Sequence, residues 1–155
     1  MTRAVHDRYH PSRRNPYNEI ECGDHYARSM GSHGIFVSVC GFEHHCPKGY
    51  IGFSPRLTPE DFRSGFIAAE GWGTFTQKRD DRLQTETLRL KYGQLNLNQM
   101  AFDLAETKRA TDVQVKLNGD VLEVNQHIAD NRVFISLIQT TTVNANQLLE
   151  IEITT

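Results

Sequence analysis

The sequence has no apolar run long enough to cross a membrane. Its most apolar stretch, Gly34 to Phe42, is about half of the ~20 residues that a spanning helix needs. The first ten residues also lack the apolar core of a secretory signal. We therefore expect a chain with no membrane span and no export signal, located in the cytoplasm.

The chain has little cysteine and no paired cysteine motif. Cys22, Cys40 and Cys46 are an odd number with no CxxC spacing, which argues against a disulfide framework and favours reduced thiols. His44 and His45 stand next to Cys46, but the spacing matches no standard zinc pattern. The sequence therefore predicts no metal site and no cofactor.

Neither sign of charge is in clear excess. The 17 basic side chains face 19 acidic ones, and Arg13-Arg14 is the only basic pair near the start. This gives no electrostatic case for a nucleic acid or an anionic lipid as partner. The hydrophobic fraction of 38% is that of an ordinary folded protein. A length of 155 residues predicts one domain, or one domain and a fragment of another.

Chemically capable side chains are concentrated in one run, Asn15 to Met30. It holds three acids, a histidine, a cysteine, an arginine and two tyrosines, and it leads directly into the apolar stretch Ile35 to Cys40. Polar groups that are carried towards an interior need partners, which is the usual condition of a binding or catalytic site.

The residues that follow Asp24 predict a helix that ends near Cys40. Small and apolar residues recur on two neighbouring stripes, and a helix apolar over so wide an arc is expected to be buried on most sides. Gly31 and Gly34 cost about 1 kcal/mol each inside a helix, so we expect another element to approach them closely. Gly41 is well placed to end the helix.

Extended chain is predicted after this helix. Phe42 to Gly52 resembles a turn-rich loop, Tyr50 to Leu57 a strand, and Phe62 to Gln77 two extended segments with a tight bend. Trp72, the single tryptophan, lies between two glycines. We interpret it as a core anchor in preference to a surface that stacks on a sugar.

From residue 84 the apolar period is two, which is typical of strands. The parity of the apolar positions shifts near Asn98, so a bulge or turn is predicted there. Asn118-Gly119 is a strong hairpin signal. About six strands are expected between residues 84 and 155, arranged as an antiparallel sheet or a small sandwich.

Four motifs in one order resemble the C-terminal end of glycoside hydrolase family 116, the family of non-lysosomal glucosylceramidase and related bacterial β-glucosidases. They are Arg14-Asn-Pro-Tyr-Asn-Glu-Ile-Glu-Cys-Gly-Asp-His-Tyr-Ala-Arg-Ser-Met30, Cys40-Gly-Phe-Glu43, Gly49-Tyr-Ile-Gly-Phe-Ser-Pro-Arg-Leu-Thr-Pro-Glu60 and Ala69-Glu-Gly-Trp-Gly-Thr-Phe75. The similarity covers about residues 3 to 77. The tail beyond it resembles, less specifically, the β extension of some bacterial members.

The resemblance implies a fold and an activity. Members of the family act from an (α/α)6 barrel and retain anomeric configuration with a nucleophilic Glu and an acid/base Asp. Both catalytic carboxylates lie in family segments that precede the part matched here. In the matched run, the family's Glu and Arg hydrogen-bond the hydroxyls of the glucosyl residue, and these correspond to Glu19 and Arg28.

The spacing of these two residues constrains where the helix starts. A separation of nine residues, at about 100° each, places Glu19 and Arg28 on opposite faces of one helix. They can share a sugar if Glu19 lies in the approach loop and Asp24 caps the helix. Two simpler interpretations remain open. Asp24 and Arg28 could form an ion pair on the helix surface, and the negative charge of Glu19 could interact favourably with the helix N-terminus.

The sequence thus predicts an α+β fragment, with one long buried helix from the end of an (α/α)6 barrel followed by an antiparallel β-sheet or small sandwich. Residues 1–77 are assigned to an incomplete catalytic domain and residues 78–155 to a β extension. We expect a piece of a retaining β-glucosidase that is inactive alone. Its partners would be a β-linked glucoside and the polypeptide that carries the rest of the barrel. The alternative is a non-catalytic carbohydrate-binding or assembly module.

Overall fold

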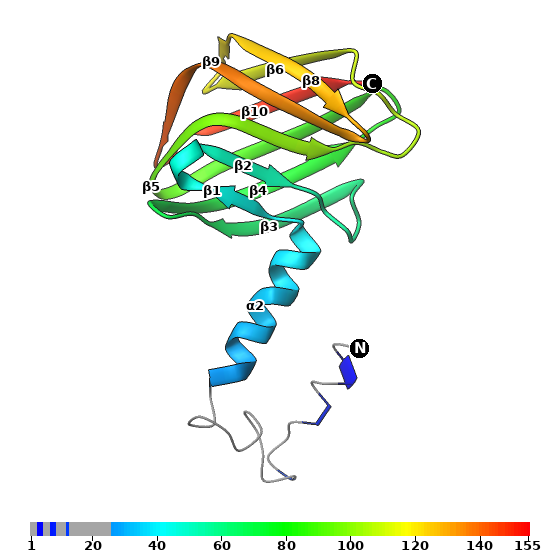
Figure 1. Cartoon of the computed structure of the whole chain (residues 1–155), viewed down its shortest axis with the longest axis vertical. Helices are drawn as coiled ribbons and strands as arrows, with labels where there is room; N and C mark the ends of the chain where they lie inside the picture. The colour runs from blue at the N-terminus through cyan, green and yellow to red at the C-terminus, as the bar shows by residue number, and fades with distance from the viewer. Residues whose placement is uncertain (1–2, 5–6, 9–11, 13–25) are drawn as a thin grey trace. The chain divides into compact units, whose positions relative to one another are not determined.

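The structure, a computed structural model, describes residues 3–4, 7–8, 12 and 26–155, with side chains described from residue 31 onwards in the last of these ranges. The chain divides into two compact units, Met1–Ser38 and Val39–Thr155. Figure 1 shows the helix that leads into the second unit and the strands that make up that unit.

The helix α2, Tyr26–Cys40, is present where the sequence predicts a helix. The prediction of a long buried helix is wrong for the part whose side chains are described, because residues 31–36 and 38 are exposed. Ile35 is 43% exposed and Phe36 37% exposed. Among the described residues, none approaches Gly31 or Gly34 as expected, since a Cβ at either position meets none of their atoms within 4 Å. An apolar stripe is buried only if a second apolar surface covers it.

The helix ends at Gly41, as predicted, with a positive φ of 55°. In this left-handed conformation a side chain is costly, and a Cβ here would also overlap the carbonyl oxygen of Ser54. None of the described helices is long and apolar enough to cross a membrane.

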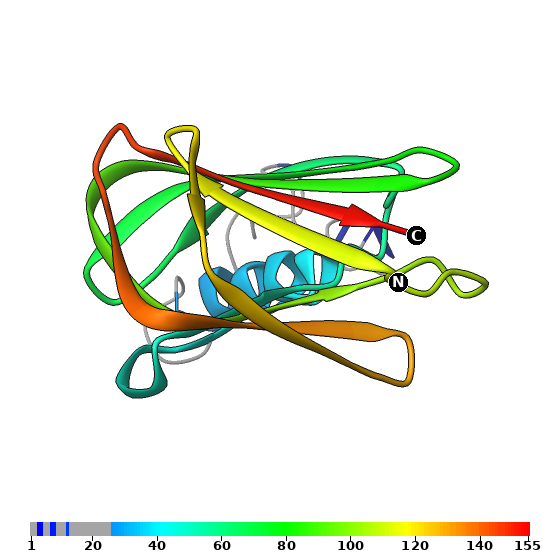
Figure 2. The ribbon, with the colours of Figure 1, turned by 90° about the horizontal axis from the view of Figure 1, so that it is seen from above.

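The second unit is a β-sandwich built from one continuous mixed sheet of ten strands. The strands are β1 Glu43–His45, β2 Tyr50–Phe53, β3 Asp61–Ile67, β4 Gly71–Arg79, β5 Leu83–Asp103, β6 Asp112–Leu117, β7 Asp120–Leu122, β8 Val124–Ala129, β9 Arg132–Asn144 and β10 Leu148–Thr154, with a short 3-10 helix η2, Cys46–Lys48, between β1 and β2. One layer has the order β3-β4-β5-β10-β6-β7, and the other has the order β1-β2-β5-β9-β8. Figure 2 shows these two layers facing each other. All pairs are antiparallel except β2 with β5.

Strand β5 belongs to both layers, and its change of layer occurs at Gly93. Residues before Gly93 pair with β4 and β10, whereas residues after it pair with β9 and β2. Gly93 has a φ of 75°, and a Cβ there would overlap the carbonyl oxygen of Glu70. Gly93 therefore forms a bend within one strand. A second irregularity, between Leu97 and Gln99, confirms the bulge predicted near Asn98.

The core between the layers is centred on stacked phenylalanines. Phe53 and Phe75 stack with ring centroids 3.8 Å apart, and Phe75 lies 6.2 Å from Phe102 in a parallel orientation. Phe66 meets Phe53 edge-on at 6.0 Å. All four side chains are almost fully buried. Offset and edge-to-face packing of this kind stabilises a core beyond the area that is buried.

Most strands occur where the sequence places them. Six strands, β5 to β10, follow residue 82, and the β6–β7 hairpin turns through Asn118 and Gly119, both with positive φ. The prediction for Phe42 to Gly52 was wrong in part, because this segment contains β1 and the start of β2. The prediction of Trp72 as a core anchor is wrong, since Trp72 is 51% exposed. Strand alternation turns Phe75 inward and Trp72 outward.

The strands β1 to β4 share their sheets with β5, and the two compact units divide between Ser38 and Val39. The assignment of residues 1–77 to a catalytic domain concerns a longer enzyme, so it stays a prediction.

Replacement of Gly93 by alanine is expected to lower the free energy of unfolding by about 3 kcal/mol or more, because left-handed backbone strain adds to a steric overlap. Gly119→Ala is the matched control. Gly119 also has a positive φ, of 93°, but has nothing within 4 Å of its Cβ position, so about 1 kcal/mol is expected. Urea denaturation of the wild type and the two variants measures both decreases in the free energy of unfolding. Equal losses in the two variants would show that Gly93 does not govern the bend.

Candidate functional site

The two residues predicted to hold a sugar cannot be placed in a site. Glu19 lies outside the described residues, and Arg28 is described only as part of the backbone of α2. Asp24 and Cys22 also lie outside the described residues. The Glu19–Arg28 pair therefore stays a prediction.

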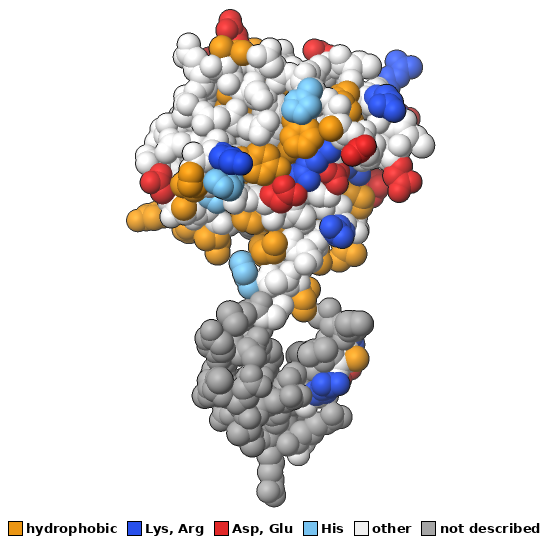
Figure 3. Space-filling model, in the orientation of Figure 1, with side chains coloured by type: hydrophobic (Ala, Val, Ile, Leu, Met, Phe, Trp, Pro, Cys, Tyr) orange, Lys and Arg blue, Asp and Glu red, His pale blue; other side chains and the backbone are white. Residues whose placement is uncertain are grey.

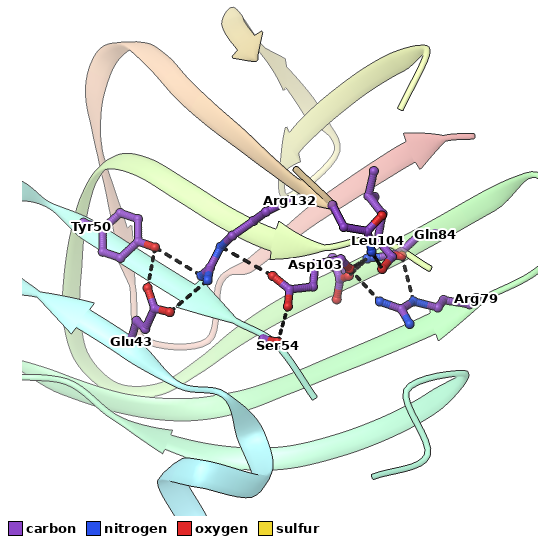
Figure 4. Close-up of polar contacts among 10 residues, drawn as sticks. Glu43, Tyr50, Ser54, Arg79, Gln84, Asp103, Leu104 and Arg132 are labelled. Atoms are coloured by element: carbon purple, nitrogen blue, oxygen red, sulfur yellow. Dashed lines mark hydrogen bonds and ion pairs between the residues drawn. The ribbon is translucent and has the colours of Figure 1, made fainter. Parts of the chain in front are cut away.

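The described part of the chain has a polar cluster on the outer face of the layer that contains β1, β2, β5 and β9. Four side chains form it, namely Glu43, Tyr50, Asp103 and Arg132, and we call it the Arg132 network (Figure 4). Nη1 of Arg132 donates to Oε1 of Glu43 at 2.9 Å, and Nη2 donates to the hydroxyl of Tyr50 at 3.2 Å. That hydroxyl donates to Oε2 of Glu43 at 2.7 Å, and Nε of Arg132 lies 3.6 Å from Oδ1 of Asp103.

Backbone geometry lets the guanidinium lie flat on the sheet. Gly52 of β2 pairs with Glu43 and with Ala101, directly beneath the network. A Cβ at Gly52 would lie 2.6 Å from Nη2 of Arg132 and 2.8 Å from the hydroxyl of Tyr50. Only glycine leaves this space free. Figure 3 shows acidic, basic, histidine and hydrophobic side chains close together on this face.

The network keeps its groups in fixed protonation states. Burial raises the pKa of Tyr50 and its hydrogen bond to Glu43 adds to this, to about 12. Burial would raise the pKa of Glu43, but the hydrogen bonds from Tyr50 and Arg132 outweigh it and lower the pKa. For Arg132, burial acts to lower the pKa, and the bond to Glu43 and nearby negative charges raise it overall. Glu43 is therefore an ion near neutral pH, and so is a poor general acid.

Asp103 extends the network across the sandwich. Its side chain accepts a hydrogen bond from the hydroxyl of Ser54. Its backbone oxygen accepts from Nη2 of Arg79 at 2.5 Å and from Nε2 of Gln84 at 2.9 Å. Arg79 lies on β4 in the opposite layer, and its Nε donates to Oε1 of Gln84 at 2.8 Å. One residue of the shared strand thus joins polar groups of both layers.

Glu86 lies at the inner end of this chain of contacts. It is fully buried, and its Oε1 accepts from Nε2 of Gln84 at 2.7 Å. Burial raises its pKa well above the usual range, against the opposing effects of Gln84 and Arg79. Its Oε2 has no hydrogen-bond partner, nor does Oε1 of Gln77, the residue directly opposite on β4. Glu86 is therefore a neutral acid inside the core, out of reach of a substrate.

Two open depressions flank the end of β5. One, of about 300 Å³, is lined by Asp103, Arg132, Phe134 and the β8–β9 turn. The other, of about 720 Å³, is lined by charged groups of both signs, among them Glu60, Arg79 and Lys108. Neither is lined by Glu86 or Glu43.

The histidine and cysteine cluster is dispersed. His44 stacks on Phe42 with ring centroids 6.3 Å apart, and burial together with His45 lowers its pKa. Cys46 is exposed, whereas Cys40 is buried, and this burial raises the pKa of its thiol. In residues 31–155 and the few described before them, there is no group of three His, Cys, Asp or Glu side chains arranged to hold a metal.

The Arg132 network mainly holds the two short strands β1 and β2 to β9. Its cation is engaged by Glu43, Tyr50 and Asp103, so little capacity is left for a ligand. Sequence reasoning missed it because Arg132 and Glu43 are 89 residues apart. The one local signal was Gly52, which follows Tyr50 within a strand and has no other reason to be glycine.

Replacement of Arg132 by methionine is expected to lower the free energy of unfolding at pH 7 by about 1 to 3 kcal/mol, because Glu43 and Asp103 lose their shared cation. Arg132→Lys keeps the positive charge but not the two parallel N–H donors of the guanidinium, and it should lower the free energy of unfolding by less. Since the pKa of folded Glu43 lies below its ordinary 4.5, its contribution is present above pH 4.5 and lost as the pH falls through the folded value. The difference in the free energy of unfolding between wild type and R132M should therefore become smaller in acid. Thermal denaturation from pH 7 to pH 3 tests this, and a constant difference would contradict it.

Glu86→Gln is expected to stabilise the protein at pH 7 by at least about 1 kcal/mol. Folded Glu86 holds a proton that the unfolded chain releases above pH 4.5, so its contribution is complete below that pH and is lost as the pH rises towards the folded pKa. The amide is neutral at every pH and can donate towards Gln77. The advantage should vanish at pH 4. A variant that is less stable at pH 7 would show that Glu86 is ionised and paired with Arg79.

Comparison with solved structures shows similarity to part of a larger enzyme. The chain is similar in structure to part of an α-L-rhamnosidase from Dictyoglumus thermophilum, a glycoside hydrolase, with a TM-score of 0.45 and 8% sequence identity over 85% of this chain. The match spans 14% of that enzyme's chain. No family model and no curated protein matches the sequence. A likeness with a TM-score below 0.5 gives no argument for function, so the resemblance to family 116 rests on its motifs.

Proposed function

We propose that the chain is the C-terminal part of a retaining β-glucosidase similar to glycoside hydrolase family 116. In this proposal the residues before the sandwich supply a wall of the glucose pocket, through Glu19 and Arg28. The observation that carries the proposal is the order of the four motifs between Arg14 and Phe75.

The structure accounts for the later motifs by packing. Gly49, Gly71 and Gly73 each meet another part of the backbone closely enough to exclude a Cβ, and Phe53 and Phe75 form the core stack. These residues are needed to build the sandwich whatever it is attached to. The first motif, Arg14 to Met30, precedes the sandwich. In this proposal it is the motif that contributes to the glucose pocket.

Glu19 and Arg28 suit the binding of a glucosyl unit. A carboxylate accepts hydrogen bonds from sugar hydroxyls, and a guanidinium donates to their oxygens in a rigid fork. Neither group is expected to break the glycosidic bond, because the family's nucleophile and acid/base lie in segments that precede the matched part.

Glu43 and Glu86 of the sandwich do not replace those residues. Retention needs two carboxyl groups about 5 to 5.5 Å apart, one of them able to donate a proton. Glu43 has a lowered pKa, and Glu86 is fully buried. The proposal therefore includes a lack of activity when the chain is alone.

Glu19→Gln and Arg28→Lys are expected to lower kcat/KM for an aryl β-glucoside by about a hundredfold, because each removes charged hydrogen bonds to the sugar. The assay uses the chain mixed with the polypeptide encoded upstream of its Met1 codon. Glu21→Gln, two residues from Glu19, is the matched control and should have little effect. The chain alone should show no turnover.

Two results would contradict the proposal. Turnover by the chain alone would mean that it holds its own catalytic pair. An effect of Glu21→Gln as large as that of Glu19→Gln would mean that the motif acts through folding. If an unrelated gene lies upstream, the alternative of an independent carbohydrate-binding or assembly module gains support.

A further inference from the structure

Three large apolar side chains lie exposed next to one another on the outer face of the layer that contains β3, β4 and β5. Ile67 is 71% exposed, Trp72 51% and Tyr92 66%. Trp72 is the direct partner of Ile67 on β3 and of Tyr92 on β5, so the three side chains form one row across three strands. We call this row the Trp72 surface.

The backbone fixes the position of Trp72. A Cβ at Gly71 would lie 2.6 Å from the carbonyl oxygen of Tyr92, and a Cβ at Gly73 would overlap the carbonyl oxygen of Arg89. The pairing passes from Trp72–Tyr92 to Gly73–Leu90, so the extra residue of this bulge is Lys91 on β5. Trp72 faces outward by regular alternation with the buried Gly71 and Gly73. The two glycines allow β4 to lie tightly against β5, and this tight pairing presents the aromatic side chain on a rigid base.

Hydrogen-bonding side chains continue from the aromatic row along β5. Gln94 and Asn96 follow the bend at Gly93 and pair with β9 in the other layer. The backbone N–H of Gln94 donates to the carbonyl oxygen of Glu70 at 3.1 Å, which joins this end of β5 to the turn just before Trp72. The side-chain amide nitrogens of Gln94 and Asn96 donate to Oε2 of Glu70 at 3.1 and 3.4 Å, and the hydroxyl of Thr142 donates to Oδ1 of Asn96 at 2.7 Å. All four of these polar residues are exposed. We call them the amide row.

We propose that the Trp72 surface and the amide row together bind a neutral saccharide chain with equatorial hydroxyls, such as a β-linked glucan. The flat C–H face of such a pyranose matches an aromatic ring. Its rim of hydroxyls matches amides and a hydroxyl, which both donate and accept, and a carboxylate, which accepts. Amide and hydroxyl groups outnumber charged ones in the row, which suits a neutral ligand. The inference uses the sandwich alone and is independent of the proposed function.

The size of the apolar row favours a saccharide over a protein partner. Three side chains of this size and exposure present roughly 400 Å², whereas a standard protein interface needs about 800 Å² from each partner. Rigid aromatic rings surrounded by polar groups are typical of small, oriented ligands.

Binding can be measured at the site itself, because Trp72 is the only tryptophan of the chain. Titration of the full chain with cellohexaose should shift the tryptophan emission to the blue, and isothermal titration calorimetry should give the same dissociation constant. Maltohexaose, with α-linkages, should bind more weakly.

Trp72→Ala and Tyr92→Ala should each weaken binding by about tenfold or more in calorimetry, and Gln94→Ala by a smaller factor. Val121→Ala, at a side chain that is 63% exposed on β7, is the matched control and should bind as wild type does. Far-UV circular dichroism should be unchanged in every variant, since all of these side chains are exposed.

The proposal is overturned if neither hexaose shifts the emission at about 10 mM, or if Trp72→Ala binds as wild type does. It is also overturned if sedimentation velocity shows self-association that Trp72→Ala abolishes and cellohexaose leaves unchanged, because the surface is then a protein contact. A failure here leaves the activity test of Glu19 and Arg28 unaffected.

Discussion

The bend of β5 at Gly93 is the constraint on which the rest of the sandwich depends. A single strand of 21 residues supplies an inner strand to both layers, so the two sheets are covalently one. The change of layer requires a positive φ and a backbone contact with Glu70 that leaves no space for a Cβ. Because Tyr92 and Gln94 stand on either side of Gly93, the bend also brings the aromatic row and the amide row together. Gly93 thus serves both the change of layer and the proposed binding surface.

At its other end, β5 is held by polar groups. The side chain of Asp103 lies against Arg132 of one layer, and its backbone oxygen accepts from Arg79 of the other. Each contact is modest, since partly exposed ion pairs are weak. These contacts serve to hold the strands in place, because β1 and β2 together have only seven residues and need side-chain contacts to stay paired. Charges that satisfy each other in this way stabilise strands and leave little reactivity for chemistry.

Local sequence rules predicted the parts of the fold that depend on nearby residues. The hairpin at Asn118-Gly119, the bulge near Asn98 and the helix end at Gly41 all follow from backbone preferences of a few residues, and the structure confirms them. The Arg132 network could not be predicted, because a partner 89 residues away leaves no periodic signal. The prediction that Trp72 lies in the core was wrong for another reason. Composition alone treats a single tryptophan as core, whereas its side of the strand is set by alternation with the inward-facing Gly71, Gly73 and Phe75.

The helix α2 shows what apolar periodicity can and cannot establish. The pattern predicts a helix, which the structure contains, but burial requires a second surface, which a pattern within one helix does not specify. Ile35 and Phe36 stay exposed, and Gly31 and Gly34 keep open space around them. Glycine at two helical positions lowers helix stability by about 1 kcal/mol each, a cost that close packing against another helix would offset. An exposed, glycine-containing apolar stripe that directly follows the motif with Glu19 and Arg28 is what the proposed function requires. In a complete barrel that stripe would face neighbouring helices.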